Sequence, residues 1–303
     1  MDEKARPRIA VLMATYNGAS WLLEQISSIL ASEDVDVTIY VSDDGSTDET
    51  LALLYAFPPS RVQVLPAVKS GGAGQNFIRA FLDAPWDSYD FVAFADQDDI
   101  WLPGKLIQAV RRLLDTGAQG YSSDVTAFWP DGTTRYVKKS QPLQRWDYHF
   151  ESGGPGNTFV LPVRQALSLR SRLRSSDPNV LRVITLHDWL IYALVRSEGH
   201  PWIIDNYSGV EYRQHAENVI GAAGGGYAIL ARFDMIRSGW YQTQILAIAE
   251  IAGRSNPVVE YLRKPTVWQI WVPFRHVRKC RRRALEAILF ALAVSVMSLS
   301  RRK

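Results

Sequence analysis

Polar side chains gather at three points in the first hundred residues, each directly after a short apolar run. The points are residues 15–17 (TYN), 43–45 (DDG) and 96–99 (DQDD). Carboxylates that converge on one edge of a sheet repel one another unless a cation lies between them, and Asp96 and Asp98 are spaced to reach one ion. Oxygen ligands of this kind favour Mg²⁺ or Mn²⁺, which can bridge the two phosphates of a nucleotide. Any one cluster alone would also fit ordinary turn chemistry.

The elements that would position these clusters alternate along the first 130 residues. Apolar runs predict strands over 8–14, 37–41, 62–65, 90–95 and 120–129, and helical spacing predicts helices over 19–30, 75–82 and 106–114. This alternation predicts an α/β fold, with a mostly parallel sheet and helices on both faces, whose ligands bind at the carboxyl ends of the strands. Two local signals add detail: Ser46 and Glu49 form a capping-box pattern, and Pro103 suits a first helical position.

The rest of the chain is less regular. It predicts a polar loop over 133–150, an apolar stretch over 157–161, helices over 163–173 and 186–195, a short strand over 202–204, a loop with four glycines over 221–226 and an amphipathic helix over 227–252. We therefore expect one sheet domain over 1–221, with a nucleotide half over about 1–130 and an acceptor half over about 131–221. A helical, basic C-terminal segment over 222–303 would follow.

Composition excludes several classes of protein. The 303 residues are 47% hydrophobic and 21% charged, which is ordinary for a globular protein and excludes a disordered scaffold. Cys280 is the single cysteine, so an internal disulfide is impossible and a reducing compartment is the simpler expectation. The first apolar run, 9–14, is too short for a secretory signal. Neither a G-x-G-x-x-G nor a P-loop pattern occurs, so dinucleotide and P-loop sites lose their main signal.

The net charge of +3 conceals an uneven distribution. Residues 263–303 carry eleven Lys and Arg and one acid, Glu286, which gives +10 there and −7 for residues 1–262. A nucleic-acid-binding face is not expected from this pattern. Within this tail, 284–299 is a sixteen-residue apolar stretch between basic clusters, shorter than the roughly 20 residues that span a bilayer. It predicts a helix lying on an anionic membrane surface. The alternative is a core helix or an interface between subunits of an oligomer.

Five motifs together resemble glycosyltransferase family 2, and within it the rhamnosyltransferase-like group that builds bacterial surface polysaccharides. In chain order they are Val11–Gly18 (VLMATYNG), Val41–Asp48 (VSDDGSTD), Ala95–Lys105 (ADQDDIWLPGK), Leu186–Trp189 (LHDW) and Tyr212–Gly221 (YRQHAENVIG). The resemblance covers roughly residues 7–222, and it implies the GT-A fold, a single Rossmann-like domain. The A-D-Q-D-D-x-W form is far more specific than a bare D-x-D pair.

For the donor side, the resemblance implies a set of residue roles. Thr15 and Asn17 would line the nucleotide pocket, Asp43 would bind the pyrimidine ring, and Asp44 would lie beside the base or ribose. The metal ligands, for Mg²⁺ or Mn²⁺, would be Asp96 and Asp98, and His215 would reach the metal or the diphosphate. Arg213 is a further cation available to the departing diphosphate. Without the resemblance, a histidine such as His215 would be read as a surface residue.

For the acceptor side, the resemblance matches Asp188 to the catalytic base. An acceptor hydroxyl is a poor nucleophile, so a carboxylate must take its proton as the new bond forms. Trp189 could cover a sugar face beside it, and Gly153 and Gly154 belong to a glycine-rich acceptor loop, 153–156. The competing interpretation is that Asp188 only stabilises a helix N-terminus.

The sequence therefore predicts an inverting, metal-dependent glycosyltransferase, peripheral on the cytoplasmic face of a bacterial membrane. The resemblance implies L-rhamnose, from dTDP-rhamnose, as the sugar and a lipid-linked oligosaccharide or polysaccharide as acceptor. A UDP-hexose donor is the nearest alternative, and a sugar nucleotidyltransferase and a non-catalytic scaffold are rivals from other classes. A processive synthase is not expected, because QPLQRW at 141–146 has the wrong spacing and order for the Q-x-x-R-W motif of such enzymes.

Overall fold

The computed structural model describes residues 6–215 and 238–300 of the chain. One nine-stranded sheet runs through it in the order β3-β2-β1-β4-β8-β6-β9-β5, and β7 pairs with β6. The strands are β1 (Arg8–Thr15), β2 (Asp36–Asp43), β3 (Val62–Val64), β4 (Phe91–Ala95), β5 (Ile100–Trp101), β6 (Gly120–Phe128), β7 (Thr134–Val137), β8 (Val160–Pro162) and β9 (Trp202–Arg213). The mixed α/β fold predicted from the sequence is confirmed.

The N-terminal part of the sheet is parallel and fixes the three polar clusters in space. β1 pairs in parallel with β2 and β4, and the register sets Thr15 opposite Asp43 and Met13 opposite Ala95. The segments that follow these strands therefore leave the sheet side by side at its carboxyl edge. This register brings residues 15–17, 43–46 and 96–99 together, as the alternation of elements predicts.

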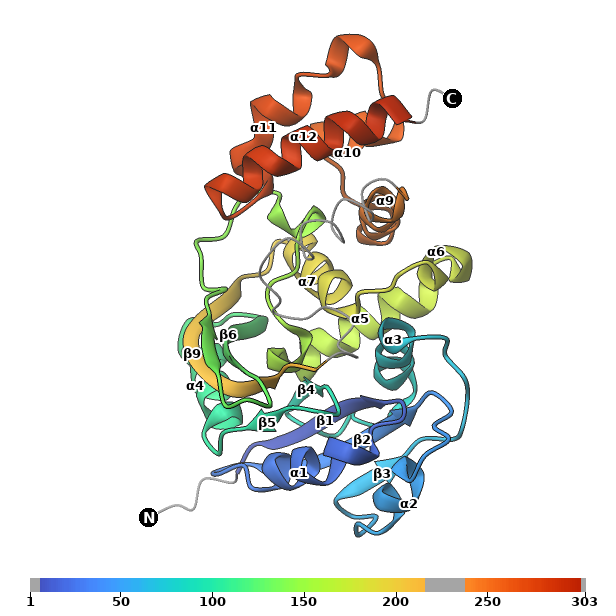
Figure 1. Cartoon of the computed structure of the whole chain (residues 1–303), viewed down its shortest axis with the longest axis vertical. Coiled ribbons are helices and arrows are strands. Elements are labelled where there is room, and N and C mark those ends of the chain that lie inside the picture. The colour runs from blue at the N-terminus through green and yellow to red at the C-terminus, as the bar shows by residue number, and fades with distance from the viewer. Residues whose placement is uncertain (1–5, 216–237, 301–303) are drawn as a thin grey trace.

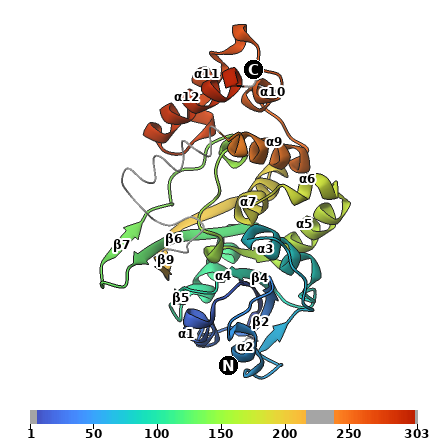
Figure 2. The same cartoon turned by 45° about the vertical axis from the view of Figure 1, so that its right-hand side comes forward.

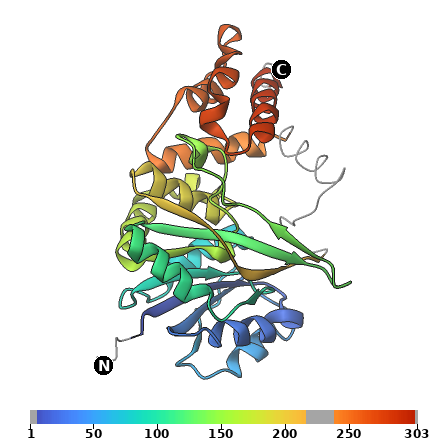
Figure 3. The same cartoon turned by 90° about the vertical axis from the view of Figure 1, so that its left-hand side faces the viewer.

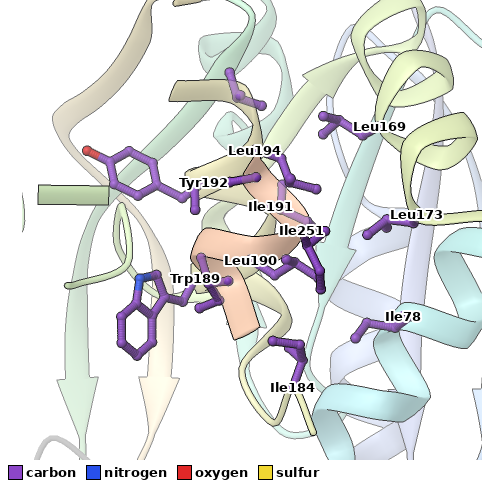
Figure 4. Close-up of a cluster of buried hydrophobic side chains, with 14 of the residues drawn as sticks. Ile78, Leu169, Leu173, Ile184, Trp189, Leu190, Ile191, Tyr192, Leu194 and Ile251 are labelled. Carbon is purple, nitrogen blue, oxygen red and sulfur yellow. The ribbon is translucent and has the colours of Figure 1, made fainter. Parts of the chain in front are cut away.

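Helices cover both faces of this sheet because successive residues of β1 point to opposite sides. Ile9 and Val11 pack on the side of α1 (Ala19–Leu30), α2 (Thr50–Tyr55) and α4 (Lys105–Thr116). Ala10 and Leu12 pack on the side of α3 (Ala73–Asp83), α5 (Val163–Ser175) and α7 (His187–Ser197) (Figure 2). Figure 4 shows how α7 enters this second core: Trp189 and Tyr192 lie on one side of the helix, opposite the aliphatic side chains of α5.

The second half of the sheet is mixed in direction. β8 is antiparallel to both β4 and β6, whereas β6 and β9 are parallel. β6 and β7 form a hairpin that projects from the body (Figure 3). Two predictions are wrong here. The loop expected over 133–150 contains β7 and the 3₁₀ turn η1 (Asp147–His149), and the strand expected over 202–204 continues to Arg213 because it pairs with the whole of β6.

Two predicted helix starts are also wrong. α2 begins at Thr50 rather than near Ser46, because the Ser46 hydroxyl donates to Asp43 Oδ2 at 2.6 Å and Asp48 Oδ1 accepts the Thr50 N–H at 3.0 Å. α4 begins at Lys105 with Gly104 at its N-cap, so Pro103 precedes the helix.

Helices at the C-terminus form a layer at the end of the molecule opposite β1–β3 (Figure 1). This layer consists of α9 (Trp240–Ala252), α10 (Pro257–Arg263), the 3₁₀ turn η3 (Val267–Gln269), α11 (Val272–Cys280) and α12 (Ala284–Ser300). Two short elements earlier in the chain, the 3₁₀ turn η2 (Gly156–Thr158) and the helix α6 (Pro178–Arg182), complete the structure. The predicted helix over 227–252 is present from Trp240, and its start, the glycine loop over 221–226 and the expected boundary near Gly221 lie outside the described residues. Over 6–215 and 238–300, no helix combines the length and apolar character needed to cross a bilayer.

Candidate active site

A cavity of about 1400 Å³ lies between the carboxyl edge of the parallel strands and the C-terminal helices. Its two sides come from different parts of the chain. The side at the strand ends is lined by Thr15, Asn17, Asp44, Asp96, Asp98 and His215. The other side is lined by Lys139, Ser152, Gly154, Gly156, Asp188, Tyr241, Arg281, Arg282, Leu289 and Leu292. We refer to these as the strand-end side and the helical side.

Asp43 accepts hydrogen bonds that hold the loops of the strand-end side together. Its carboxylate accepts hydrogen bonds from Thr15 Oγ1 at 2.7 Å, from Gly45 N at 3.0 Å and from Ser46 N at 2.8 Å, in addition to the Ser46 hydroxyl. The side chain is 5% exposed and does not line the cavity. Its lone pairs are thus used inside the protein, and pyrimidine binding by Asp43 stays a prediction.

Asn17 and Asp44 line the cavity and fix its rim. Asn17 has a left-handed backbone (φ 47°), which asparagine tolerates, and its Oδ1 accepts the Thr47 N–H at 2.8 Å. Asp44 accepts the N–H groups of Gly71 at 3.0 Å and Gly72 at 2.8 Å, which joins the β2 end to the loop before α3. These hydrogen bonds hold the loops at the rim of the cavity on this side, and nucleotide binding by Asn17 and Asp44 stays a prediction.

Negative charge accumulates at the end of β4. Burial and the carboxylates of Asp98 and Asp188 raise the pKa of Asp96 to about 8. His215 Nε2 lies 2.7 Å from Asp98 Oδ2, and the His215 ring stacks on Trp21 with centroids 4.2 Å apart. His215 therefore pairs with Asp98, and Asp96 lies within electrostatic range of Asp98; a metal site shared by the three stays a prediction.

Arg213 supports this acidic loop from behind. Its Nε donates to the Asp98 carbonyl at 2.7 Å, its backbone N–H donates to Asp99 Oδ1 at 3.1 Å, and its guanidinium pairs with Glu24. It does not line the cavity. Burial and the charges of Asp98 and Asp96 raise the pKa of Asp99 well above its usual range. Arg213 therefore positions the loop, and its predicted contact with the nucleotide stays untested.

Asp188 lies in the first turn of α7 and faces the cavity. Leu186 is the N-cap residue of this helix, so Asp188 does not cap it. Burial raises the pKa of Asp188, while hydrogen bonds from the Trp189 N–H and the Ser152 hydroxyl and the charge of Lys139 oppose that rise. The neighbouring His187 ring is stacked on Phe77 with centroids 3.8 Å apart, which holds the start of the helix in place.

Trp189 and the glycine loop have structural roles that the sequence did not reveal. Trp189 lines the cavity, but its ring is only 3% exposed, donates from Nε1 to the Tyr148 carbonyl at 2.9 Å and stacks on Tyr241. Sugar binding by Trp189 stays a prediction. Gly153 lies under the cavity wall, where a Cβ would come within 2.7 Å of the Tyr192 ring. Gly154 lines the cavity.

Several cavity residues were missed by sequence reasoning. They are Lys139, Ser152, Tyr241, Arg281 and Arg282. The basic run 281–283 predicted contact with a membrane, but the Arg282 guanidinium is 4% exposed and lies 3.6 Å from Asp147 and 3.5 Å from Glu151. Arg281 is paired with Glu286 at 3.0 Å. The single acid in the basic tail was the sequence feature that could have predicted this pairing, because one acid among several arginines indicates an ion pair within the protein.

The arrangement is that of an α/β group-transfer enzyme, with carboxylates gathered at the strand ends and a further carboxylate, Asp188, across the cavity. The chain matches the Glycosyl transferase family 2 model over residues 10–171. It is 38% identical over 256 residues to dTDP-rhamnosyl transferase RfbG of Shigella flexneri, covering 83% of this chain and 88% of RfbG. The chain belongs to glycosyltransferase family 2.

Two further relatives extend this comparison. The Escherichia coli UDP-Glc:alpha-D-GlcNAc-diphosphoundecaprenol beta-1,3-glucosyltransferase WfgD is 31% identical over 106 residues, 35% of this chain and 41% of WfgD. The crystal structure of S. aureus TarS 1–349 superposes with a TM-score of 0.52 at 14% identity, covering 97% of this chain and 91% of that one. TarS thus shares the GT-A fold. The protein is a glycosyltransferase, and its family indicates a nucleotide sugar as donor.

Proposed function

We propose that this enzyme transfers L-rhamnose from dTDP-rhamnose to a lipid-linked oligosaccharide or polysaccharide. The rhamnosyl donor is supported by the 38% identity to RfbG, which extends over most of both chains. The observation that carries the reaction type is the cavity itself, which brings Asp188 within electrostatic range of the acidic pair at the end of β4. WfgD, similar over 35% of this chain, supports a UDP-hexose as the alternative donor.

The acidic pair suits a divalent cation. Asp96, Asp98 and His215 offer oxygen and imidazole donors on one wall. Burial, together with the charges of Asp98 and Asp188, raises the pKa of Asp96, and a cation would offset those charges. Among the described residues no preformed cluster of three or more acidic, histidine or cysteine ligands occurs. Mg²⁺ or Mn²⁺ would therefore be held by one or two side chains and by the donor phosphates, and it would stabilise charge on the departing diphosphate.

The chain's own residues would carry the proton in an inverting displacement. Asp188 accepts the proton of the acceptor hydroxyl while that oxygen forms a bond to the anomeric carbon. The bond from this carbon to the diphosphate breaks, and the electron pair leaves with the nucleotide. A pKa raised by burial suits Asp188 to this task, because it brings the carboxylate closer to the working pH.

Replacing the base tests this mechanism. We expect Asp188→Asn to lower kcat by about a hundredfold to ten-thousandfold, the usual contribution of a general base, and to leave the affinity for dTDP unchanged. Asp115→Asn, at an exposed carboxylate of α4, is the matched control and should keep full activity. Product formation from dTDP-rhamnose and calorimetric binding of dTDP and UDP provide the readouts. Full activity of Asp188→Asn would refute the assignment, and tighter binding of UDP would replace the rhamnosyl donor by another sugar.

Attachment to the cytoplasmic face of a bacterial membrane belongs to the same proposal. Trp268, 95% exposed, and Trp271 lie in η3 and at the N-cap of α11, and α12 also carries exposed apolar residues. The same C-terminal part of the chain carries exposed basic residues: Arg263, Lys264, Arg275, Arg278, Lys279 and Arg283. Indole rings and cations together suit the interface of an anionic bilayer.

Vesicle sedimentation tests this attachment. We expect the protein to sediment with vesicles containing phosphatidylglycerol and much less with pure phosphatidylcholine, and we expect 0.5 M NaCl to release it. A Trp268→Ser/Trp271→Ser double variant should lose most of this binding, whereas Tyr55→Ser, at an exposed ring on α2, should not. Equal sedimentation of both variants would argue against the tryptophan surface.

A further inference from the structure

Gln97, which lies between Asp96 and Asp98 in the sequence, contacts the first polar cluster at two points. Its Oε1 accepts the Tyr16 N–H at 2.9 Å, and its Nε2 donates to the Tyr16 carbonyl at 3.0 Å. One carboxamide thus satisfies both backbone polar groups of Tyr16, as a neighbouring strand would. A carboxylate at this position could accept from the N–H but could not donate to the carbonyl. The contact therefore depends on an amide side chain between the two acids.

The Gln97 carboxamide also packs against Gly18, the N-cap residue of α1. A Cβ on Gly18 would overlap Gln97 Oε1 and would lie 2.5 Å from its Cδ and 3.1 Å from its Nε2. The backbone of Gly18 has φ −100° and ψ 10°, which residues with a side chain also adopt. The Gln97 amide, and not the backbone conformation, is therefore what requires a glycine at this position.

The acids on either side of Gln97 are held by other contacts. The fully buried Gln25 of α1 donates from Nε2 to the Asp96 carbonyl at 2.9 Å, and Arg213 donates from Nε to the Asp98 carbonyl at 2.7 Å. The backbone of the acidic loop is thus fixed from α1 and from the end of β9. Removing the Gln97 side chain should therefore release Tyr16 without displacing the two acids.

The segment that Gln97 holds presents its side chains to the cavity. Tyr16, Asn17 and Gln97 all line it, and the Tyr16 side chain is 57% exposed although its backbone groups are bonded. An exposed aromatic ring suits stacking on a nucleobase. The segment is therefore fixed through its backbone and leaves the Tyr16 ring free to contact a ligand.

We propose that Gln97 is a positioning residue that holds Tyr16 and Asn17 in the conformation that binds the nucleoside of the donor. The inference rests on the proposed function, in which the donor nucleotide lies on the strand-end side. It gives the residue between the two acids a role of its own, because Gln97 ties the loop predicted to hold the cation to the loop predicted to hold the base.

Nuclear magnetic resonance titration of the full chain tests the proposal, with thymidine and uridine as probes because neither carries a phosphate. We expect Gln97→Ala to weaken the better-bound nucleoside about tenfold, as two hydrogen bonds that order its site are lost. Gln75→Ala is the matched control, because Gln75 also donates to two backbone carbonyls, of Leu181 and Ile184, but does not line the cavity. An unchanged affinity in Gln97→Ala, or an equal loss in Gln75→Ala, would overturn the proposal.

A double-variant cycle with Gly18 tests the contact itself. Gly18→Ala should displace the Gln97 amide and weaken the nucleoside by about the same factor as Gln97→Ala. The double variant Gly18→Ala/Gln97→Ala should be no weaker than either single variant, because both changes break one contact. Losses that multiply to about a hundredfold would show two independent effects and would overturn the role of this contact.

Calorimetry of inorganic pyrophosphate with Mn²⁺ separates positioning of the nucleoside from general damage to the acidic loop. We expect its affinity in Gln97→Ala to stay within twofold of the wild type, because Gln25 and Arg213 still hold the loop. A loss equal to that of the nucleoside would overturn the proposal. The proposed donor fails separately: tighter binding of uridine than of thymidine would count against dTDP-rhamnose and would leave Gln97 to be judged with uridine. Binding of neither nucleoside to the wild type would overturn the nucleoside site itself.

Discussion

The two sides of the cavity are built in different ways, although they serve one reaction. The strand-end side comes mainly from segments that follow β1, β2 and β4, which the register of β1 against β2 and β4 places, and the chain just after β9 adds His215. The helical side is assembled from the β6–β7 hairpin, the loop before β8, the start of α7 and α12. The first side depends on local sequence and one parallel sheet, and the second depends on contacts between distant segments.

The chemistry of the two sides differs in the same sense. On the strand-end side, carboxylates are collected near one another and leave negative charge for a ligand to offset. On the helical side, the acids Asp147, Glu151 and Glu286 are matched by arginines inside the protein, and the remaining lining is largely apolar. One side is therefore dominated by carboxylates, and the other by internally paired charges and apolar side chains.

The largest effect should follow from removing charge on the strand-end side. We expect Asp98→Asn to lower kcat/KM about a thousandfold, because losing a contact to the cation costs several kcal/mol when the diphosphate departs. Titration of Mn²⁺ by electron paramagnetic resonance, with dTDP present, should show weaker metal binding in this variant. If Mn²⁺ affinity and activity were both unchanged, Asp98 would not be a metal ligand. The difference in charge between the two sides of the cavity would then have no role in metal binding.

This difference explains what could be predicted from the sequence. β1 and β4 were predicted closely because continuous apolar runs are typical of strands buried on both faces, and the clusters at their ends followed. β9 was missed beyond Ile204 because Asp205, Asn206 and Ser208 break the apolar pattern. Only pairing with β6 keeps that segment extended, and no local signal encodes it.

The helical side was predicted in part, for the same physical reason. Asp188 could be found because it belongs to a short motif. Lys139 could not, because its position is set by Asp124 fifteen residues earlier in the chain. Arg282 was assigned to a membrane surface, because its partners Asp147 and Glu151 lie more than 130 residues away in the sequence. Charge counted along a sequence does not show which charges are already paired.

Loss of the Arg282 ion pairs should lower the stability of the protein through the helical side and leave ligand binding on the strand-end side unchanged. Arg282→Met removes a counter-ion from the buried Asp147 and from the partly buried Glu151, so we expect the free energy of unfolding to fall by about 3 kcal/mol. Urea denaturation measures this, with Arg278→Met on the exposed face of α11 as control. dTDP binding in the absence of urea should persist in the variant. A loss below about 1 kcal/mol would mean that Asp147 is satisfied by Arg196 and Tyr192 alone.

A smaller effect is expected where the two sides meet. A Cβ on Gly156 would lie 2.7 Å from His187 Nε2 and 3.2 Å from Asp188 Cβ, and stacking on Phe77 keeps the His187 ring from moving away. Gly156→Ala should therefore shift the start of α7 by a few tenths of an ångström and lower kcat about tenfold without changing dTDP affinity. Gly104→Ala, where the nearest atom is Tyr207 Oη at 3.3 Å, is the matched control. Equal activity of the two variants would show that Asp188 tolerates displacement.

The smallest expected effect is a pH dependence of protein stability that arises next to the helical side alone. His149 is fully buried, and its Nδ1 accepts a hydrogen bond from Asn256 Nδ2 at 2.9 Å. Asn256 cannot reverse its amide, because its Oδ1 accepts the Val258 and Val259 N–H groups at the start of α10. The imidazole must therefore stay neutral, and burial lowers the pKa of His149 from 6.5 to about 4.

The sign of the pH dependence follows from this lowered pKa. Between pH 6.5 and about 4 the unfolded chain binds a proton that the folded chain does not, so stability falls as the pH falls. The slope from this one group is at most about 1.4 kcal/mol per pH unit. Urea denaturation of the wild type and of His149→Phe at pH 6.5, 5.5 and 5.0 measures it. We expect the variant to be less stable at neutral pH but to lose less stability on acidification, since His187 and the carboxylates still contribute. Parallel pH profiles would assign the acid sensitivity to other groups and would leave the Asn256 contact as packing alone.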